Sequence, residues 1–338
     1  KGIFDEHPEF FPMNKAGKRQ PEMWNQGICG TAETLPGYLA DKIFAKLGDA
    51  PQDTERMFKI GQGDGFVGCH CKACRKLVHE QGSEAAPLIH VFNRTLDIVT
   101  KKYPNVNIIT FCYFNSLEAP KKMKVHDNLW VNVVSSARSK NAAGDQMGPI
   151  QNNPGNADYA RALKEWPRIA PGRVMVWHWD TYRAEWPSMF YVQESVRYMA
   201  DCGVFGINPQ TCGGPWNSML NWLYMKLTWN PDQDGDALIR QYAEDTYSKA
   251  AAPHLVAYLE TGKQAYEAAL HVPSAVRWSG WTRITMDKLF PESVRRKMIP
   301  LMDKAQAAAA QSGTDAQQRN LLRARVGSRD KVVLEAAV

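Results

Sequence analysis

Four cysteines have the residue type and the spacing of a metal site. Cys69, Cys71 and Cys74 form a CxCxxC cluster, and Cys29 precedes them in the chain. Deprotonated cysteines favour tetrahedral zinc, and a site closed by four protein ligands is structural rather than catalytic. The cluster needs a fourth ligand, and the candidates are Cys29, His70 and His79. Reduced free thiols and a disulfide are the two other interpretations that the sequence leaves open.

An acidic side chain lies just before this cluster, in a glycine-rich turn. The apolar run with Met57, Phe58 and Ile60 predicts a buried strand, and Asp64 stands in the Gly-Asp-Gly turn that follows. A strand that delivers a carboxylate into a loop ahead of a helix is how α/β barrels place catalytic groups. Asp64 is therefore a candidate catalytic residue. The alternative is a turn that this side chain stabilises by hydrogen bonds to its own backbone.

Two further carboxylates follow predicted strands. Asp180 comes directly after Trp179, and burial beside indoles raises the pKa of a carboxyl group toward that of a general acid. Asp180 is the second catalytic candidate, with a salt bridge to Arg183 as the alternative. Glu33 follows the predicted strand Gly27–Gly30 and is a candidate substrate-binding residue. It equally suits the first turn of the next helix, where acids are favourable.

Side chains suited to sugars accompany these acids. The chain has eleven tryptophans, and their flat apolar rings can stack on pyranose faces. Aromatic, amide and imidazole groups also lie at the ends of predicted strands. The candidate substrate contacts of this kind are Tyr113, Asn115, His178 and Trp179. Each of them also suits a packing role in the core or at its rim.

The elements that must position these residues alternate between strands and helices. Short apolar runs are typical of parallel strands that are covered on both faces. Six such runs are Gly27–Gly30, Met57–Gly61, Val106–Cys112, Leu129–Ser135, Val174–Trp179 and Val204–Asn208. Helical patterns between most of them are Leu35–Leu47, Leu88–Tyr103, Asp158–Trp166 and Val192–Ala200. This alternation predicts βαβ units and a parallel sheet.

The pattern changes after the segment Trp229-Asn230-Pro231-Asp232. Residues 233–338 carry no strand pattern and consist of amphipathic, alanine-rich helical segments. We therefore expect two domains, a parallel α/β barrel over residues 1–232 and a helical domain over residues 233–338. Six strands are two short of an eight-stranded barrel. Either the first two βα units precede Lys1 or the sheet is open.

Composition narrows the classes of protein to consider. The formal net charge of +6 comes from scattered Lys and Arg residues, which indicates solvated surface rather than a nucleic-acid site. No apolar run reaches the roughly 18 residues of a membrane span. Seven cysteines, an odd number, argue against a fully paired disulfide framework. No signal peptide is visible in the sequence.

A series of short motifs also runs along the chain. They are His7-Pro8-Glu9-Phe10-Phe11, Gly17-Lys18-Arg19, Cys29, the Gly-Asp-Gly turn with CxCxxC, Val174-Met175-Val176-Trp177 with Asp180 and Tyr182, Gly203-Val204-Phe205-Gly206, and Lys226-Leu227-Thr228-Trp229-Asn230-Pro231-Asp232. In this order they resemble the bacterial domain of unknown function 4838, which includes glycoside hydrolase family 163. The resemblance covers roughly residues 3 to 265. One departure is Gly63, because the family often has Asn before the acid of the turn.

The resemblance implies a TIM-type (β/α)8 barrel and an endo-β-N-acetylglucosaminidase that cleaves the chitobiose core of complex N-glycans. On such a sugar the acetamide can act as the nucleophile, so that configuration is retained. One carboxylate then orients the acetamide and a second is the acid/base. We expect Asp64 and Asp180 to be this pair.

Other interpretations stay open beside this one. They are an exo-hexosaminidase, an α-glucuronidase type of glycosidase, and a non-catalytic glycan-binding barrel. The expected partner is an oligosaccharide or the glycan of a glycoprotein, and no catalytic cofactor is expected. The resemblance places such a protein in the periplasm, at the cell surface or outside a bacterial cell.

Overall fold

The computed structural model describes residues 2–22, 27–64, 68–134, 149–151, 153, 156–178, 188–209, 214–270 and 291–327. The chain divides into two compact units. Unit 1 comprises Lys1–Lys140, Asp158–Trp177 and Cys202–Ile207, and unit 2 comprises Asn141–Ala157, His178–Asp201 and Asn208–Val338.

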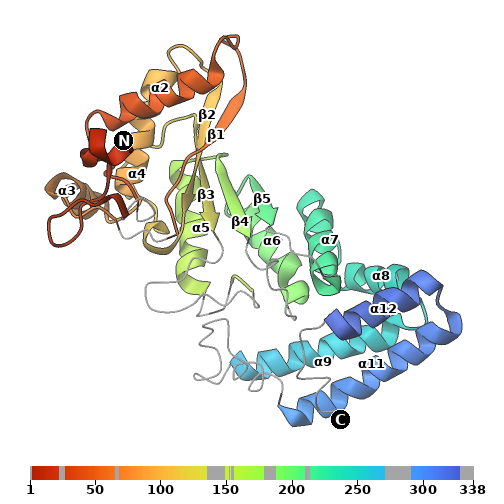
Figure 1. The fold of residues 1–338 in the computed structure, drawn as a ribbon. Helices are drawn as coiled ribbons and strands as arrows, with labels where there is room; N and C mark the ends of the chain where they lie inside the picture. The colour runs from red at the N-terminus through yellow and green to blue at the C-terminus, as the bar shows by residue number, and fades with distance from the viewer. Residues whose placement is uncertain are drawn as a thin grey trace. The chain divides into compact units, whose positions relative to one another are not determined.

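A five-stranded parallel sheet is the central element of the fold (Figure 1). Its strands are β1 (Arg56–Lys59), β2 (Val106–Cys112), β3 (Leu129–Val134), β4 (Val174–His178) and β5 (Gly206–Pro209). They lie side by side in the order of the sequence, so each connection crosses over to the next strand, as βαβ units do. Because β1 and β5 remain edge strands among the described residues, the sheet is an open half-barrel.

The prediction of a closed eight-stranded barrel is wrong for the part of the chain that the structure describes. Five strands are present there, and the two edge strands do not pair with each other. The predicted strand Gly27–Gly30 is a loop, in which Gly27 has a φ of +118°. Cys29 of this loop is buried because it joins a cysteine cluster and not because it lies in a sheet. The other five predicted strands are present, with ends shifted by at most two residues.

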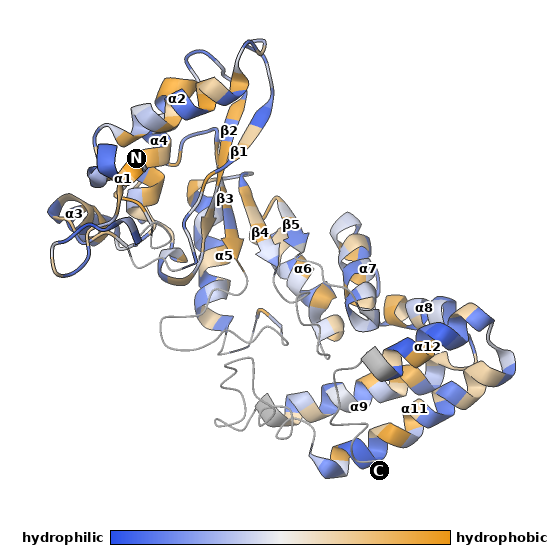
Figure 2. Cartoon of the chain, viewed as in Figure 1, coloured by the Kyte–Doolittle hydropathy of each residue, from blue (hydrophilic) through white to orange (hydrophobic). Residues whose placement is uncertain are grey.

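Unit 1 has described helices before and between its strands. They are α1 (Ile3–Glu6), η1 (Pro8–Phe10), α2 (Leu35–Leu47), α3 (Lys72–Gln81), α4 (Ala86–Val99), η3 (Phe114–Ser116) and α5 (Ala157–Ile169), whose first residue belongs to unit 2. α4 packs against α2 and against β2 and β3, and Figure 2 shows α4 and β2 as mainly hydrophobic. Every second residue of β2 is fully buried, while the residues between them are partly exposed. The two faces of the sheet therefore differ.

Unit 2 is helical beyond the ends of β4 and β5 in the part that is described. Its helices are η6 (Ser188–Tyr191), α6 (Val192–Asp201), α7 (Pro215–Trp229), α8 (Gly235–Tyr247), α9 (Ala252–Leu270), α11 (Glu292–Ser312) and α12 (Asp315–Gly327). α8 begins at a side-chain cap, because Asp234 Oδ1 accepts from the backbone N–H groups of Asp236 and Ala237 at 2.9 and 3.0 Å. Among the described helices, none has both the length and the apolar character that a membrane span requires.

Gly30 permits a close approach of two backbone segments beside Cys29. A Cβ atom on residue 30 would lie 1.9 Å from the carbonyl oxygen of Pro87 in α4, so one segment would have to move. We expect Gly30→Ala to lower the free energy of unfolding by about 3 kcal/mol, the upper end for overpacking. The control is Gly37→Ala in α2, where a Cβ meets nothing within 4 Å and alanine is favoured by about 1 kcal/mol. Urea denaturation measures both, and equal stability of the two variants would contradict the close approach.

Candidate functional site

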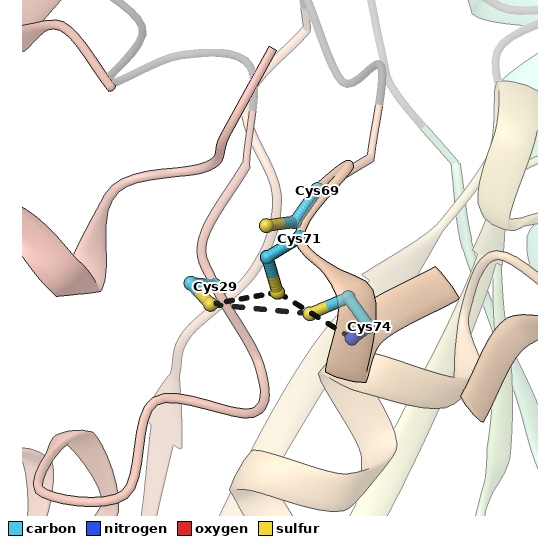
Figure 3. A group of neighbouring side chains, drawn as sticks. All are labelled: Cys29, Cys69, Cys71 and Cys74. Atoms are coloured by element: carbon cyan, nitrogen blue, oxygen red, sulfur yellow. Dashed lines mark hydrogen bonds between the residues drawn. The ribbon is translucent and has the colours of Figure 1, made fainter. Parts of the chain in front are cut away.

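The sulfur atoms of Cys29, Cys69, Cys71 and Cys74 all lie within 4.8 Å of one another (Figure 3). Cys29 Sγ is 3.7 Å from Cys71 Sγ and 3.9 Å from Cys74 Sγ. Thiolates bound at about 2.3 Å to a tetrahedral zinc ion lie about 3.8 Å apart. The spacing of the four sulfurs therefore fits a metal ion of this kind. Of the candidates for the fourth ligand, the structure brings in Cys29, and the group includes neither His70 nor His79.

Helix α3 positions two of these cysteines. Cys71 is its N-cap residue, and the backbone N–H of Cys74, in the first turn, donates to Cys71 Sγ at 3.4 Å. The N-terminus of a helix favours negative charge, and it stabilises a thiolate over a thiol. Thr31 adds a hydroxyl group, with its Oγ1 3.1 Å from Cys74 Sγ. The local sequence thus folds into a site that suits anionic sulfur.

The other two cysteines are tied to a segment near the N-terminus. Cys29 donates its backbone N–H to the carbonyl of Phe10 at 2.8 Å. Met13 donates its backbone N–H to Cys69 Sγ at 3.2 Å and accepts from the N–H of His70 at 2.8 Å. Residues 10–13 therefore bridge the loop that carries Cys29 and the loop that carries Cys69.

A half-buried positive charge, the guanidinium of Arg19, also favours ionised sulfur in this cluster. The pKa of the Cys29 thiol is held far below its usual range, because Cys69 and Cys74 donate hydrogen bonds to its sulfur and the Arg19 guanidinium is adjacent. The pKa values of Cys69 and Cys74 are raised by their hydrogen bonds to Cys29 and by burial. Within the cluster these contacts therefore favour negative charge on Cys29. A metal ion would displace the protons of the other thiols.

An ion pair fixes the cluster to the start of α4. Arg75 donates Nε to the carbonyl of Cys69 at 2.9 Å, and its Nη1 and Nη2 contact the two carboxylate oxygens of Glu84, the first at 2.7 Å. Such two-point pairing is both strong and directional. Gly68 has a φ of +80°, and a Cβ there would lie 2.7 Å from Glu84 Oε2. The position before Cys69 therefore requires glycine for two reasons.

Arg19 contacts the cysteine cluster, although the sequence did not indicate it. Its Nη2 lies 3.5 Å from Cys29 Sγ, and its Nη1 donates to the carbonyl of Phe11. Substitution of such a neighbour costs about 10- to 100-fold in metal affinity. We expect Arg19→Gln to weaken zinc binding by that factor in a competition titration with a chelator. Lys18→Gln, an exposed charge in the same loop, is the control. A loss of the same size in both variants would show that only net charge matters.

Asp64 lies at the carboxyl end of β1 and meets a side chain that follows β2. Tyr113 Oη donates a hydrogen bond to Asp64 Oδ1 at 2.6 Å. Burial raises the pKa of the Tyr113 phenol, and the hydrogen bond to Asp64 raises it further, so the phenol stays a donor. Asp64 itself is exposed to solvent. The structure therefore brings two of the predicted site residues together, as an accessible carboxylate held by a buried phenol.

Three residues that the sequence reasoning missed hold this pair in place. Gln62 donates Nε2 to the carbonyl of Tyr113 at 3.1 Å and accepts from Ser116 Oγ. Ser116 Oγ also accepts from the backbone N–H of Tyr113 at 3.1 Å. Phe114 has a φ of +52°, a backbone conformation that costs free energy in a non-glycine residue and is common at functional sites. The sequence could have indicated Gln62, because this residue lies in the same glycine-rich turn as Asp64. No local sequence pattern indicates Phe114.

The remaining predicted residues do not gather around Asp64 in the described part of the chain. Glu33 lines a separate surface cavity of about 560 Å³, whose lining includes neither Asp64 nor Tyr113. Asn115 lies partly buried in η3. His178 is 2% exposed, and its Nε2 is hydrogen-bonded to Tyr224 Oη of α7, an arrangement that suits packing. Trp179 and Asp180 lie outside the described residues.

Comparison with known proteins gives one match. A family model described as a domain of unknown function (DUF4838) covers residues 2–260, which is more than half of the chain. No curated protein and no solved structure matched the chain. The match includes the whole sheet, the four cysteines and the Asp64–Tyr113 pair.

Proposed function

Because the chain belongs to the DUF4838 family, whose description states no activity, we propose a function from the geometry of the site. One structural zinc ion is bound by Cys29, Cys69, Cys71 and Cys74. The observation that carries this proposal is the convergence of four sulfur atoms within 4.8 Å. Four thiolates are the donor set that zinc prefers in closed sites, and they leave no open position for a substrate. Reduced free thiols and a disulfide are the two competing uses of these cysteines.

The zinc ion would hold together segments that are distant in the sequence. Cys29 precedes α2, whereas Cys71 and Cys74 begin α3. Two of the cysteine loops also border predicted site residues, because Glu33 follows Cys29 and Asp64 precedes Cys69. A structural metal stabilises such loops without help from a large local core. The centre would therefore hold the described segments that carry the four cysteines in place.

We also propose that the protein is a glycoside hydrolase of the family 163 type, acting on the N-acetylglucosamine of an N-glycan core. The specific observation in favour is the Asp64–Tyr113 hydrogen bond of 2.6 Å at the carboxyl end of the sheet. Active sites of α/β folds occupy this end of the strands. A carboxylate held by a neutral phenol is suited to orient the acetamide of the sugar.

The proposed reaction has two displacements. The acetamide oxygen attacks the anomeric carbon and forms a cyclic oxazolinium ion, whose charge the Asp64 carboxylate balances, while the glycosidic oxygen leaves with a proton from the acid/base residue. Water then attacks the same carbon, gives its proton back to that residue and reopens the ring, so the configuration is retained. Asp64 orients and polarises the acetamide N–H. Asp180 is the proposed acid/base.

The test is incubation of the protein with a complex N-glycopeptide, followed by mass spectrometry. Endo-acting hydrolysis leaves one N-acetylglucosamine on the asparagine and releases the rest of the glycan in one piece. Release of single sugars would replace this proposal with an exo-hexosaminidase or glucuronidase type of activity. Binding of the glycopeptide without any hydrolysis would replace it with a glycan-binding protein.

A further inference from the structure

Cys71 is the most accessible member of the four-cysteine group. It is partly exposed, whereas Cys29, Cys69 and Cys74 are 2%, 2% and 0% exposed. Cys71 caps the N-terminus of α3, and its Sγ accepts the backbone N–H of Cys74 at 3.4 Å. Accessible thiolates at helix N-termini react with oxidants, whereas buried cysteines are inert. A small oxidant that reaches this centre therefore meets Cys71 first.

A second sulfur is close enough to react with an oxidised Cys71. Cys29 Sγ lies 3.7 Å from Cys71 Sγ (Figure 3), so a disulfide of about 2.0 Å requires an approach of about 1.7 Å. Redox-sensitive cysteines are often placed beside such a resolving partner. Cys74 is the other candidate partner, but it is fully buried and its Sγ lies 3.1 Å from the hydroxyl of Thr31. The geometry therefore favours Cys29.

We propose that Cys71 is a peroxide-reactive site, and that its oxidation replaces the zinc ion by a disulfide between Cys29 and Cys71. This inference rests on the proposed zinc centre, in which all four sulfurs are thiolates. Its occupant is a small peroxide, because the accessible sulfur belongs to a partly exposed residue within a mostly buried group.

The reaction has two steps. The Cys71 thiolate attacks one oxygen of hydrogen peroxide, the O–O bond breaks, and hydroxide leaves from a sulfenic acid on Cys71. The Cys29 thiolate then attacks that sulfur, the S–O bond breaks, and a second hydroxide leaves. The two sulfurs together lose two electrons, and the peroxide is reduced to two hydroxide ions. Zinc departs because two of its four ligands are now joined to each other.

The disulfide would join two segments that the zinc ion also joins. Cys29 lies in the loop before α2, and Cys71, 42 positions further along the chain, caps α3. A cross-link over such a loop restricts the unfolded chain and stabilises the folded one. The group therefore keeps these segments linked through zinc in reducing surroundings and through the disulfide in oxidising ones. Cys69 and Cys74 stay reduced in both states.

The experiment is titration of the zinc-loaded full chain with hydrogen peroxide. An indicator that is too weak to extract zinc by itself follows the released metal, and remaining thiols are alkylated before peptide mapping. Trypsin cleaves after Lys72 and so separates Cys71 from Cys74, while fragmentation distinguishes Cys71 from Cys69. We expect one zinc ion released and one Cys29–Cys71 disulfide formed for each peroxide consumed. A dithiol reductant with added zinc should reverse both changes.

Two histidine variants separate oxidation from zinc binding. Cys71→His can keep the metal, because zinc accepts three cysteines and one histidine, but it forms no disulfide. Only buried thiolates are left in it, so peroxide should release its zinc at least about tenfold more slowly. Cys69→His changes a buried ligand and should still form the Cys29–Cys71 disulfide. Cys202→Ser, at a partly exposed cysteine outside the group, should leave zinc release unchanged.

Several outcomes would overturn the inference. They are zinc retained in excess peroxide, zinc released without a disulfide at Cys71, a disulfide between another pair of cysteines, and equal release rates for the wild type and Cys71→His. Native mass spectrometry establishes first which variants hold zinc, and the wild-type peptide map decides if neither histidine variant does. A wild-type chain that binds no zinc would refute the zinc centre and the inference together. A zinc-bound chain that resists peroxide would refute the inference alone.

Discussion

Cys74→Ala is expected to prevent zinc binding and to destabilise unit 1 by more than about 4 kcal/mol, the range that follows loss of a metal site. Cys74 is fully buried at the start of α3, and its sulfur lies 3.9 Å from that of Cys29. Three thiolates cannot close a tetrahedral site, and apparent zinc-binding free energies of about 10–16 kcal/mol are available to folding in small structural sites. Thermal unfolding followed by circular dichroism measures the loss. Addition of a strong chelator to the wild type should reproduce it.

Cys112→Ala is the matched control for this substitution. Cys112 is equally buried, in β2, and is not part of the four-cysteine group. Burial also raises the pKa of its thiol, so it stays neutral and does not favour a metal. Its truncation leaves a small cavity and should cost about 1–2 kcal/mol with zinc retained. If both variants lose the same stability and the chelator has no effect on the wild type, the cysteines pack without a metal.

Asp64→Asn is expected to lower the hydrolysis rate of an N-glycopeptide by about 10²- to 10⁴-fold, the usual contribution of a positioned catalytic carboxylate. The amide keeps the shape and can still accept from Tyr113 Oη, which lies 2.6 Å from Asp64 Oδ1. It loses the negative charge that orients and polarises the acetamide. The loss should fall on kcat with little change in KM, because the charge acts mainly in the transition state.

Two comparisons make this prediction specific. Tyr113→Phe removes the donor and keeps the ring, and it should lower kcat by a smaller factor than Asp64→Asn. Asp53→Asn, at an exposed position in a turn before β1, should leave the rate unchanged. Equal rates for the wild type and Asp64→Asn would remove Asp64 from the reaction.

The strands were predictable because each is a local pattern. Short apolar runs identified β1 to β5, but the expectation of burial was wrong for β1, whose four residues are exposed or only partly buried. The same rule failed at Gly27–Gly30, where Cys29 is buried in the cysteine cluster and the positive φ of Gly27 does not suit a strand. The closed barrel failed for another reason. Closure depends on whether the first and last strands pair, and no local pattern in β1 or β5 encodes that.

Part of the candidate site could be predicted, because several of its residues lie in recognisable sequence motifs or directly after predicted strands. CxCxxC indicated three ligands, and Cys29 was named as a candidate fourth because its loop could approach them. Asp64 and Tyr113 were named separately, and they meet because the carboxyl ends of neighbouring parallel strands lie at the same edge. The contacts of Arg19 and Met13 with the cluster were not predictable. They depend on an N-terminal segment that approaches Cys29 and Cys69 only in the folded chain.

Native mass spectrometry of the protein, purified without chelator, is the most direct test of the zinc centre. The account predicts one zinc ion per chain, released when the protein is denatured in acid, and a Cys74→Ala chain that carries none. The contradicting result is a folded wild-type chain without metal, in which all four cysteines are either disulfide-bonded or modified by a thiol reagent without loss of structure.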